Sequence, residues 1–241
     1  MDVLKFRLSG ETAFFKKPDV NSNIYFTYSS IHKVVLLGLF GAIVGYKGYN
    51  SRAKSEIYPE FYSKLSNLKV AIKPNNEKNI INKKIQTFNN SVGYASQEQG
   101  GNLIVKEQWL EKPSWDIYII IDCEEAKHLA EEIKNRRAKF IPYLGKNDHI
   151  ANIDEIEIIT DVNRINNFEN LDSLFIKGNI KLELDDESDE EFYKYQERLP
   201  IKLNEITSLY EFETFVYTNM LVKNNTELYV LKIQNKNIAF F

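Results

Sequence analysis

The 241-residue sequence contains one cysteine, three histidines, two methionines and two tryptophans. Because Cys123 has no partner for an internal disulfide, the composition fits a reducing compartment, and we expect a cytoplasmic protein. His32, His128 and His149 are too scattered for a metal site, and one cysteine gives no zinc-binding spacing. The sequence also has no phosphate-binding loop, dinucleotide fingerprint or nucleophile elbow. It therefore predicts neither a metal site nor another cofactor.

Long hydrophobic runs are scarce as well. Residues 1–7 carry charges where a signal peptide needs an apolar core, so the sequence does not indicate export. The apolar stretch at residues 34–46 is shorter than the ~20 residues that a membrane-spanning helix needs. Its three glycines suit close packing of a helix against a sheet as well as they suit a helix dimer in a membrane, so the length decides. We therefore expect a buried helix there and no membrane partner.

The hydrophobic content of 43% is sufficient for a buried core, but the charges are unevenly distributed. The net charge is −3; residues 1–152 carry 22 Lys and Arg against 16 Asp and Glu, and residues 153–241 carry 9 against 18. A basic surface attracts polyanions by releasing their counterions, so the first half is the expected place for RNA. Chance variation along a chain is the alternative.

The hydrophobic pattern predicts an α+β protein. Leu4, Phe6 and Leu8 alternate with polar residues, as in a strand with one buried face. Further elements are predicted as a helix at 31–46 capped by Ser29 or Ser30, strands at 68–72, 103–110 and 116–121, a helix at 123–137 capped by Asp122, and a strand at 153–162.

With the strand-like material at 103–121 counted as the single core strand that follows the insertion, the order is βαββαβ, which predicts a ferredoxin-like, RRM-like domain over residues 1–162. Its helices are expected to cover one face of the sheet and leave the other face open, as in RNA-recognition modules. Residues 75–102 are polar and contain an extended segment, which indicates a functional insertion. Residues 163–241, with short strands around an acidic run at 185–191, are expected to form a smaller β-rich C-terminal extension.

The loop Phe14-Phe15-Lys16-Lys17 is the strongest local signal for RNA. Aromatic faces stack on unpaired bases, contributing ~1–3 kcal/mol per base, and neighbouring lysines neutralise phosphates. A buried aromatic pair between solvated lysines is an equally good interpretation. If the loop binds RNA, replacing both lysines by Ala weakens binding and its salt dependence. Lys78, Lys83 and Lys84 in the insertion are further candidates, with a solvated hairpin face as the alternative.

His32 is the one candidate for acid–base catalysis. A metal-free ribonuclease needs a general acid, a general base and a cation at the scissile phosphate. His32 precedes a predicted helix, lies next to Lys33, and has Tyr25 and Tyr28 nearby in sequence. We favour the alternative that His32 packs or caps at the helix start, and we assign no catalytic residue.

Several motifs in this order resemble the CRISPR-associated protein 5 family, a family of repeat-associated mysterious proteins (RAMP), closest to subtype I-B. They are the opening strand at 4–10, the aromatic–basic loop at 13–18, the glycine-containing helix at 38–45, the strands around Pro113 and the loop at 142–147. The resemblance covers residues 1–160 and leaves the C-terminal part matched in size and β character alone.

This resemblance implies a non-catalytic subunit of a type I surveillance complex (Cascade). Such subunits bind and cap the 5′ handle of the guide crRNA, contact the backbone and large subunits, and reach target DNA indirectly. It also implies that the insertion is a β-hairpin thumb over the guide. The subtype I-C members cut precursor RNA without a metal, so a metal-independent endoribonuclease is one alternative, and a protein-interaction module without RNA is another.

The predicted RNA-binding set combines the local signals with the resemblance. It consists of Arg7, Phe14, Phe15, Lys16, Lys17, Tyr28, His32, Lys33, Lys83, Lys84, Tyr143, Lys146 and Asn147.

Overall fold

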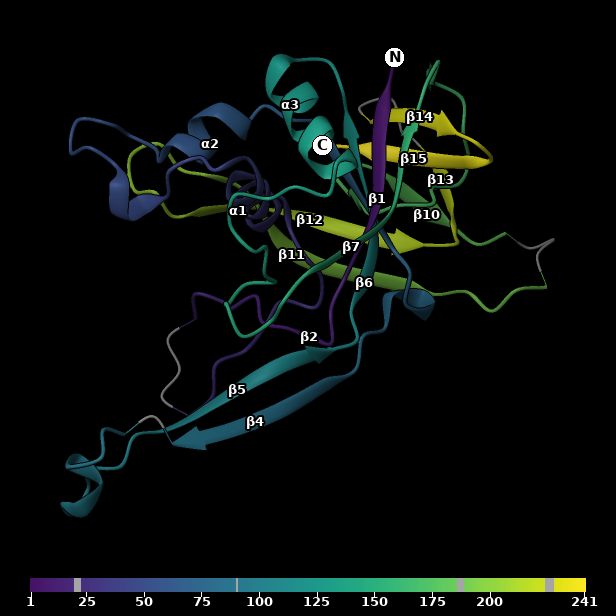
Figure 1. Cartoon of the computed structure of the whole chain (residues 1–241). Helices are drawn as coiled ribbons and strands as arrows, with labels where there is room; N and C mark the ends of the chain where they lie inside the picture. The colour runs from purple at the N-terminus through teal and green to yellow at the C-terminus, as the bar shows by residue number, and fades with distance from the viewer. Residues whose placement is uncertain (20–22, 90, 186–188, 224–227) are drawn as a thin grey trace.

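The computed structural model describes residues 1–19, 23–89, 91–185, 189–223 and 228–241. These residues form three α-helices and 15 strands in five small antiparallel sheets (Figure 1). The predicted α+β class is confirmed. Residues 20–22, 90 and 186–188, which belong to the predicted aromatic–basic loop region, insertion and acidic run, lie outside the described residues.

The central sheet has four strands in the order β3-β6-β1-β7. They are β1 (Val3–Ser9), β3 (Val70–Pro74), β6 (Ser114–Ile120) and β7 (Asn152–Ile159). Helices α1 (Lys33–Val44) and α2 (Glu60–Leu65) lie between β1 and β3 in sequence, and α3 (Glu124–Lys134) lies between β6 and β7. The elements of this sheet therefore follow one another as β1, α1 and α2, β3, β6, α3 and β7, whereas the predicted strand at 103–110 corresponds to β5 (Ile104–Glu111), which belongs to another sheet.

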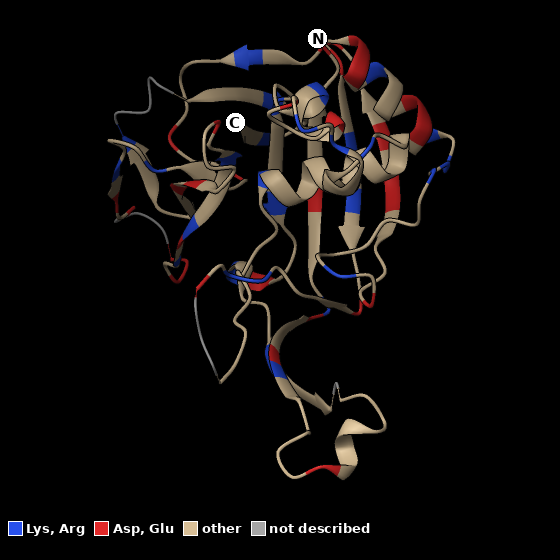
Figure 2. Ribbon diagram, turned by 90° about the vertical axis from the view of Figure 1, so that its left-hand side faces the viewer, with Lys and Arg blue, Asp and Glu red and all other residues tan. Residues whose placement is uncertain are grey.

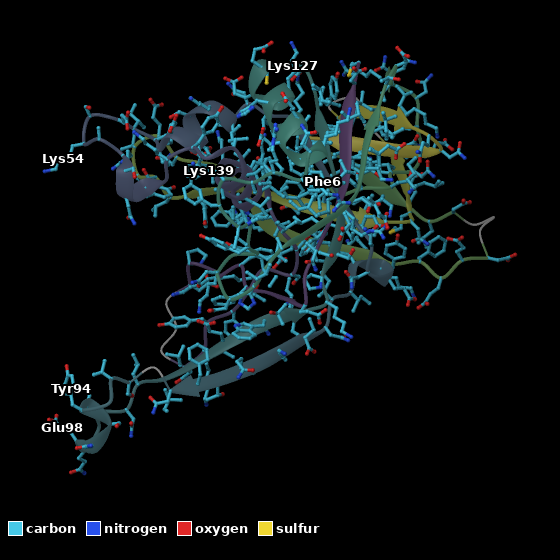
Figure 3. The ribbon with its side chains drawn as sticks, in the orientation of Figure 1. Phe6, Lys54, Tyr94, Glu98, Lys127 and Lys139 are labelled. Atoms are coloured by element: carbon cyan, nitrogen blue, oxygen red, sulfur yellow. The ribbon has the colours of Figure 1, made fainter. Side chains whose placement is uncertain are left out.

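The helices cover one face of this sheet (Figure 1). Leu4, Phe6 and Leu8 of β1 point into this core, and the Phe6 ring meets Phe40 of α1 edge-on at 6.3 Å (Phe6 is labelled in Figure 3). Gly41 of α1 is required for the close approach of α2, because a Cβ atom there would lie 2.5 Å from the Phe61 Cβ. Tight packing of this kind makes the core intolerant of added volume.

The opposite face is not open, so that prediction is wrong. Strands β8 (Asn163–Ile165), β14 (Tyr229–Ile233) and β15 (Lys236–Phe240) form a sheet that packs on it, as Figure 1 shows. Val3 and Tyr118 are buried there against Leu231 and Ile238. Burying this apolar surface is favourable. The rest of the face is polar, and Lys5 and Arg7 of β1 form ion pairs there.

The outer edge of β3 is also paired. Val70 exchanges two backbone hydrogen bonds with Phe241, at 3.1 and 3.0 Å, and the Leu174 N–H donates to the Ile72 carbonyl at 2.8 Å. Segments distant in sequence thus satisfy the groups that an edge strand otherwise exposes.

The helix ends differ from those predicted. His32 is the N-cap of α1 and Cys123 the N-cap of α3, and neither makes a side-chain cap bond. The Ser30 hydroxyl is buried without a partner among the described residues, and Asp122 pairs with Lys69 instead. No helix within the described residues is long and apolar enough to cross a membrane.

A long hairpin extends away from the rest of the molecule (Figure 1). It consists of β4 (Lys83–Asn89) and β5 (Ile104–Glu111), and β2 (Thr12–Ala13) pairs with β5 to complete a three-stranded sheet. The remaining strands are β9 (Phe175–Ile176), β10 (Lys181–Glu183), β11 (Lys194–Leu203), β12 (Tyr210–Thr218) and β13 (Leu221–Lys223).

Candidate nucleic-acid interface

The N-terminal loop is fixed to the hairpin by backbone hydrogen bonds. The Tyr25 N–H donates to the Lys106 carbonyl, and the Gln108 N–H donates to the Tyr25 carbonyl, both at 2.9 Å. Within the loop, the Lys17 N–H donates to the Phe26 carbonyl at 2.8 Å. The segment at 25–28 therefore bridges the aromatic–basic motif and β5.

A second loop, residues 142–150, packs on the same junction. Gly145 has a φ of +92°, and a Cβ atom there would lie 1.9 Å from the Phe14 carbonyl oxygen, so the position requires glycine. His149 is buried in the loop, where its Nδ1 and the Thr12 hydroxyl are hydrogen-bonded at 2.6 Å. Its ring meets Trp109 of β5 edge-on at 4.6 Å. These contacts hold the second loop against the hairpin.

We call this junction the hairpin base, defined as residues 12–17, 25–29, 83–88, 105–111 and 142–150. A cavity of about 430 Å³ opens there, within the size range of ligand sites. Its lining includes five residues of the predicted RNA-binding set: Phe14, Phe15, Lys16, His32 and Lys146. Tyr25, Val35, Glu107, Gly145 and Tyr210 complete the lining.

Four rings of the predicted set are buried. Phe14, Phe15, Tyr28 and His32 are each 2–3% exposed, so they pack inside the protein and do not present faces for base stacking. The exposed rings at the hairpin base are Tyr25 (36%), Phe26 (38%) and Tyr143 (44%), of which only Tyr143 is in the predicted set. The interpretation of Phe14 and Phe15 as a buried aromatic pair is the one that the structure matches.

His32 lies among aromatic rings. Tyr28 and Tyr210 meet it edge-on at centroid distances of 5.3 and 5.6 Å, and its Nδ1 has no hydrogen-bond partner among the described residues. Burial lowers the pKa of His32 to about 3, so the imidazole is neutral at pH 7. Burial and the neighbouring Tyr210 raise the pKa of Tyr28.

Three lysines of the predicted set are paired with carboxylates. Lys17 Nζ lies 2.9 Å from Glu197 Oε1, Lys84 Nζ lies 3.6 Å from Glu111 Oε1, and Lys146 Nζ lies 3.1 Å from Glu107 Oε1. The Glu107 carboxylate is buried and also accepts from the Trp109 indole N–H at 2.9 Å. These pairings reduce the net positive charge of the hairpin base.

Other cations at the hairpin base are less constrained. Lys16 Nζ lies 3.7 Å from the centroid of the Tyr25 ring, which is a cation–π contact, and Lys83 Nζ donates to the Ser29 hydroxyl at 2.7 Å. Lys16 and Lys106 are exposed and pair with no carboxylate among the described residues. A positive, ring-bearing surface of this kind suits single-stranded nucleic acid.

Arg7 and Lys33 lie outside the hairpin base. Arg7 points from β1 to the face opposite the helices, where it pairs with Asp116 and Glu155. The Lys33 ammonium donates to the Phe241 carbonyl at 3.2 Å, and burial lowers its pKa to about 8. Asn147 is exposed on the second loop.

Glu107, Glu197, Trp109 and the exposure of Tyr25 were not predicted from the sequence. Tyr25 was visible as an aromatic residue near the lysines, and Trp109 as part of a strand. The two glutamates give no local signal, because their lysine partners are distant in sequence. Glu197 pairs with Lys17 across 180 positions, and Glu107 pairs with Lys146 across 39.

No protein-family model matches the sequence, and no curated protein matches it. Solved structures resemble it in fold. A chain of a CRISPR RNA-guided surveillance complex superposes with a TM-score of 0.53 at 10% identity, covering 92% of this chain and 91% of that chain. A CRISPR protein from Archaeoglobus fulgidus gives a TM-score of 0.52 at 11% identity, with 99% and 98% covered. The chain therefore shares the fold of CRISPR-associated proteins.

Proposed function

We propose that this protein is a non-catalytic, RNA-binding subunit of a CRISPR RNA-guided surveillance complex. The observation that carries the proposal is the hairpin base, where exposed rings and lysines from three separate segments meet beside a cavity. This junction occurs on a fold shared, over nearly the whole of both chains, with a component of such a complex. RNA is the ligand that such a surface and such a fold suit together.

Within that class we propose the CRISPR-associated protein 5 family, closest to subtype I-B, in a type I complex. The order β3-β6-β1-β7 and the βαββαβ connectivity support a ferredoxin-like core. The β4–β5 hairpin takes the role of the thumb. The RNA is then the 5′ handle of the crRNA, the protein partners are the backbone and large subunits, and target DNA is reached indirectly in a cytoplasmic complex.

The environment of His32 supports binding over cleavage. A neutral, buried imidazole with a pKa of about 3 is poorly matched to proton transfer near pH 7. The neighbouring Lys33 ammonium donates to the Phe241 carbonyl, so it does not form a catalytic pair with the ring. We therefore assign no catalytic residue.

Titration of fluorescent single-stranded repeat RNA tests the proposal. Lys16→Ala combined with Lys106→Ala removes two cations that have no carboxylate partner among the described residues. This variant should bind more weakly, and the slope of log K against log salt should flatten by about 1.4, at ~0.7 for each phosphate that a lysine no longer neutralises. The matched control is Lys54→Ala with Lys139→Ala, two exposed lysines that pair with no carboxylate among the described residues and lie away from the hairpin in Figure 3.

Equal reductions in the two variants, or no reduction in either, would contradict an RNA surface at the hairpin base. A cleavage assay with chelator present addresses the second candidate activity. The repeat RNA should stay intact, whereas site-specific cutting that His32→Ala abolishes would favour an endoribonuclease. A purified complex that contains no RNA would leave protein interaction alone as the role.

A further inference from the structure

One carboxylate between the N-terminal loop and β11 is surrounded by hydrogen-bond donors. Glu197 Oε1 lies 2.9 Å from Lys17 Nζ. Glu197 Oε2 accepts from the Ser29 backbone N–H at 2.9 Å and from the Tyr195 hydroxyl at 2.7 Å. A second ammonium, that of Lys83, is close to this group, because it donates to the Ser29 hydroxyl at 2.7 Å. An ammonium, an amide and a hydroxyl thus converge on one anion.

These donors are the groups that bind phosphate in proteins. Backbone N–H groups, hydroxyls and lysines make most contacts between proteins and nucleic-acid backbones. Hydrogen bonds to a charged oxygen are stronger than neutral ones, for a phosphate as for a carboxylate. A second cation nearby suits the higher charge density of an RNA backbone, and a single carboxylate leaves the two lysines with a net positive charge.

The cluster is open to solvent at one side. The Glu197 side chain is 13% exposed and the Lys17 side chain 30%, so an anion from solution can reach the ammonium. Tyr195 is half-buried, and burial raises its pKa, so its hydroxyl stays protonated and can donate to either anion. Glu197 is paired across the sheet with Phe215, a buried residue of β12, so strand pairing fixes its backbone. Its carboxylate remains partly exposed to solvent.

We propose that Lys17, Lys83, Ser29 and Tyr195 form a phosphate-binding site that Glu197 occupies when no RNA is bound. A phosphate of the RNA backbone then binds by taking the place of this carboxylate. The assignment of this phosphate to RNA rests on the proposed function. The hydrogen-bond donors are present whichever phosphate compound binds. Glu197 acts as an internal competitor that weakens binding of polyanions in general.

Glu197→Gln tests the competition, because it removes the charge and keeps a similar shape. Affinity for single-stranded RNA at low salt should rise roughly fivefold, the scale of one partly exposed charge pair. The slope of log K against log salt should steepen by about 0.7, because RNA binding to the original chain exchanges a carboxylate for a phosphate at Lys17, whereas binding to the variant neutralises a phosphate with an ammonium that had no anionic partner. The matched control is Glu205→Gln, an exposed carboxylate in the turn between β11 and β12, which should change neither value.

Lys17→Ala in both backgrounds makes the test specific to this pair. In the original chain, RNA binding exchanges one partner of Lys17 for another, so losing the lysine should cost little affinity. In the Glu197→Gln background, the same change should abolish the gain in affinity. An equal loss in the two backgrounds would overturn the proposal.

Inorganic pyrophosphate separates the site from the proposed function. It should raise the melting temperature of Glu197→Gln more than that of the original chain, and Lys17→Ala should remove the difference. Stabilisation by pyrophosphate without RNA binding would uphold the site and overturn the RNA function. RNA binding that is unchanged by Glu197→Gln, with no pyrophosphate effect, would overturn the site alone.

Glu197→Asp is the second variant if Glu197→Gln does not fold. It keeps the charge but withdraws the carboxylate from Lys17 by one methylene. Its pyrophosphate response should then lie between those of the original chain and a chain without the competitor. A response equal to that of the original chain counts against the proposal.

Discussion

At its base, the β4–β5 hairpin is held by two loops, a buried histidine and lysine–carboxylate pairs, whereas its tip makes hydrogen bonds within itself. Residues 91–104 contain a single charged residue, Glu98, and Figures 2 and 3 show this end far from the core. The Ser96 hydroxyl donates to the Gly93 carbonyl, and the Leu103 N–H donates to the Ser91 hydroxyl. Tyr94 is 78% exposed. The base therefore sets the direction of the hairpin, and among the described residues no hydrogen bond or ion pair joins residues 91–103 to the body.

Two glycines with positive φ sharpen this comparison most. Gly145 at the base has a φ of +92° and no room for a Cβ atom, whereas Gly100 at the tip has a φ of +77° and no atom within 4 Å of that position. Gly145→Ala should lower the free energy of unfolding by about 2–5 kcal/mol, from backbone strain and overpacking together. Gly100→Ala should cost about 1–2 kcal/mol from strain alone.

Urea denaturation of the two variants measures this difference. Equal changes in stability would show that the packing of the second loop on Phe14 contributes nothing beyond backbone strain, and would remove the distinction between base and tip.

The buried histidine beside the base gives the next effect. Because burial lowers the pKa of His32 to about 3, an unfolded chain binds a proton below pH 6.5 that the folded chain does not. Its contribution to stability is complete above pH 6.5 and is lost as the pH falls toward 3, at about 1.4 kcal/mol per pH unit.

Urea denaturation at pH 6 and pH 5 checks this slope. His32→Phe should lose that part of the pH dependence, because phenylalanine suits the surrounding rings and binds no proton. His128→Gln, at an exposed position of α3, is the control and should keep the dependence of the original chain. A slope that His32→Phe leaves unchanged would mean that His32 is protonated in the folded protein.

The smallest effect is expected at the tip. Tyr94→Ala removes a large ring, yet the ring is mostly exposed, so the free energy of unfolding should change by no more than about 0.5 kcal/mol. A thermal melt compared with the original chain measures it. A destabilisation of more than about 1 kcal/mol would reveal packing that ties the tip to the body.

The core elements could be predicted from sequence where burial leaves a local period. Strand β6 is a run of β-branched and aromatic residues, and α3 buries Ala126, Leu129 and Ile133 on one face. Strand β11 escaped prediction, because its charged residues and Pro200 hide the alternation. The sheet β15-β14-β8, which packs on the face of the central sheet opposite the helices, was also not predicted. This packing joins β1 and β14, which are distant in sequence.

Part of the candidate site follows from the sequence: two of its lysines do, whereas the cation Lys106 and the exposed rings Tyr25 and Phe26 do not. Lys16 and Lys146 were identified from short motifs, and both line the cavity. The exposure of Phe14 and Tyr25 depends on tertiary packing. Tyr25 is hydrogen-bonded to β5, and residues 142–150 pack on the N-terminal loop at Phe14. No local pattern encodes such docking, and the same holds for the partner that Glu197 provides for Lys17.

The paired margin of β3 has a consequence for assembly. Phe241 and Leu174 form hydrogen bonds with the backbone groups of Val70 and Ile72. A strand from another molecule therefore cannot pair with the β3 edge at these residues. Neighbouring molecules must then recognise side chains here. Removing Phe241 would expose the backbone N–H and carbonyl of Val70 and favour strand exchange between copies.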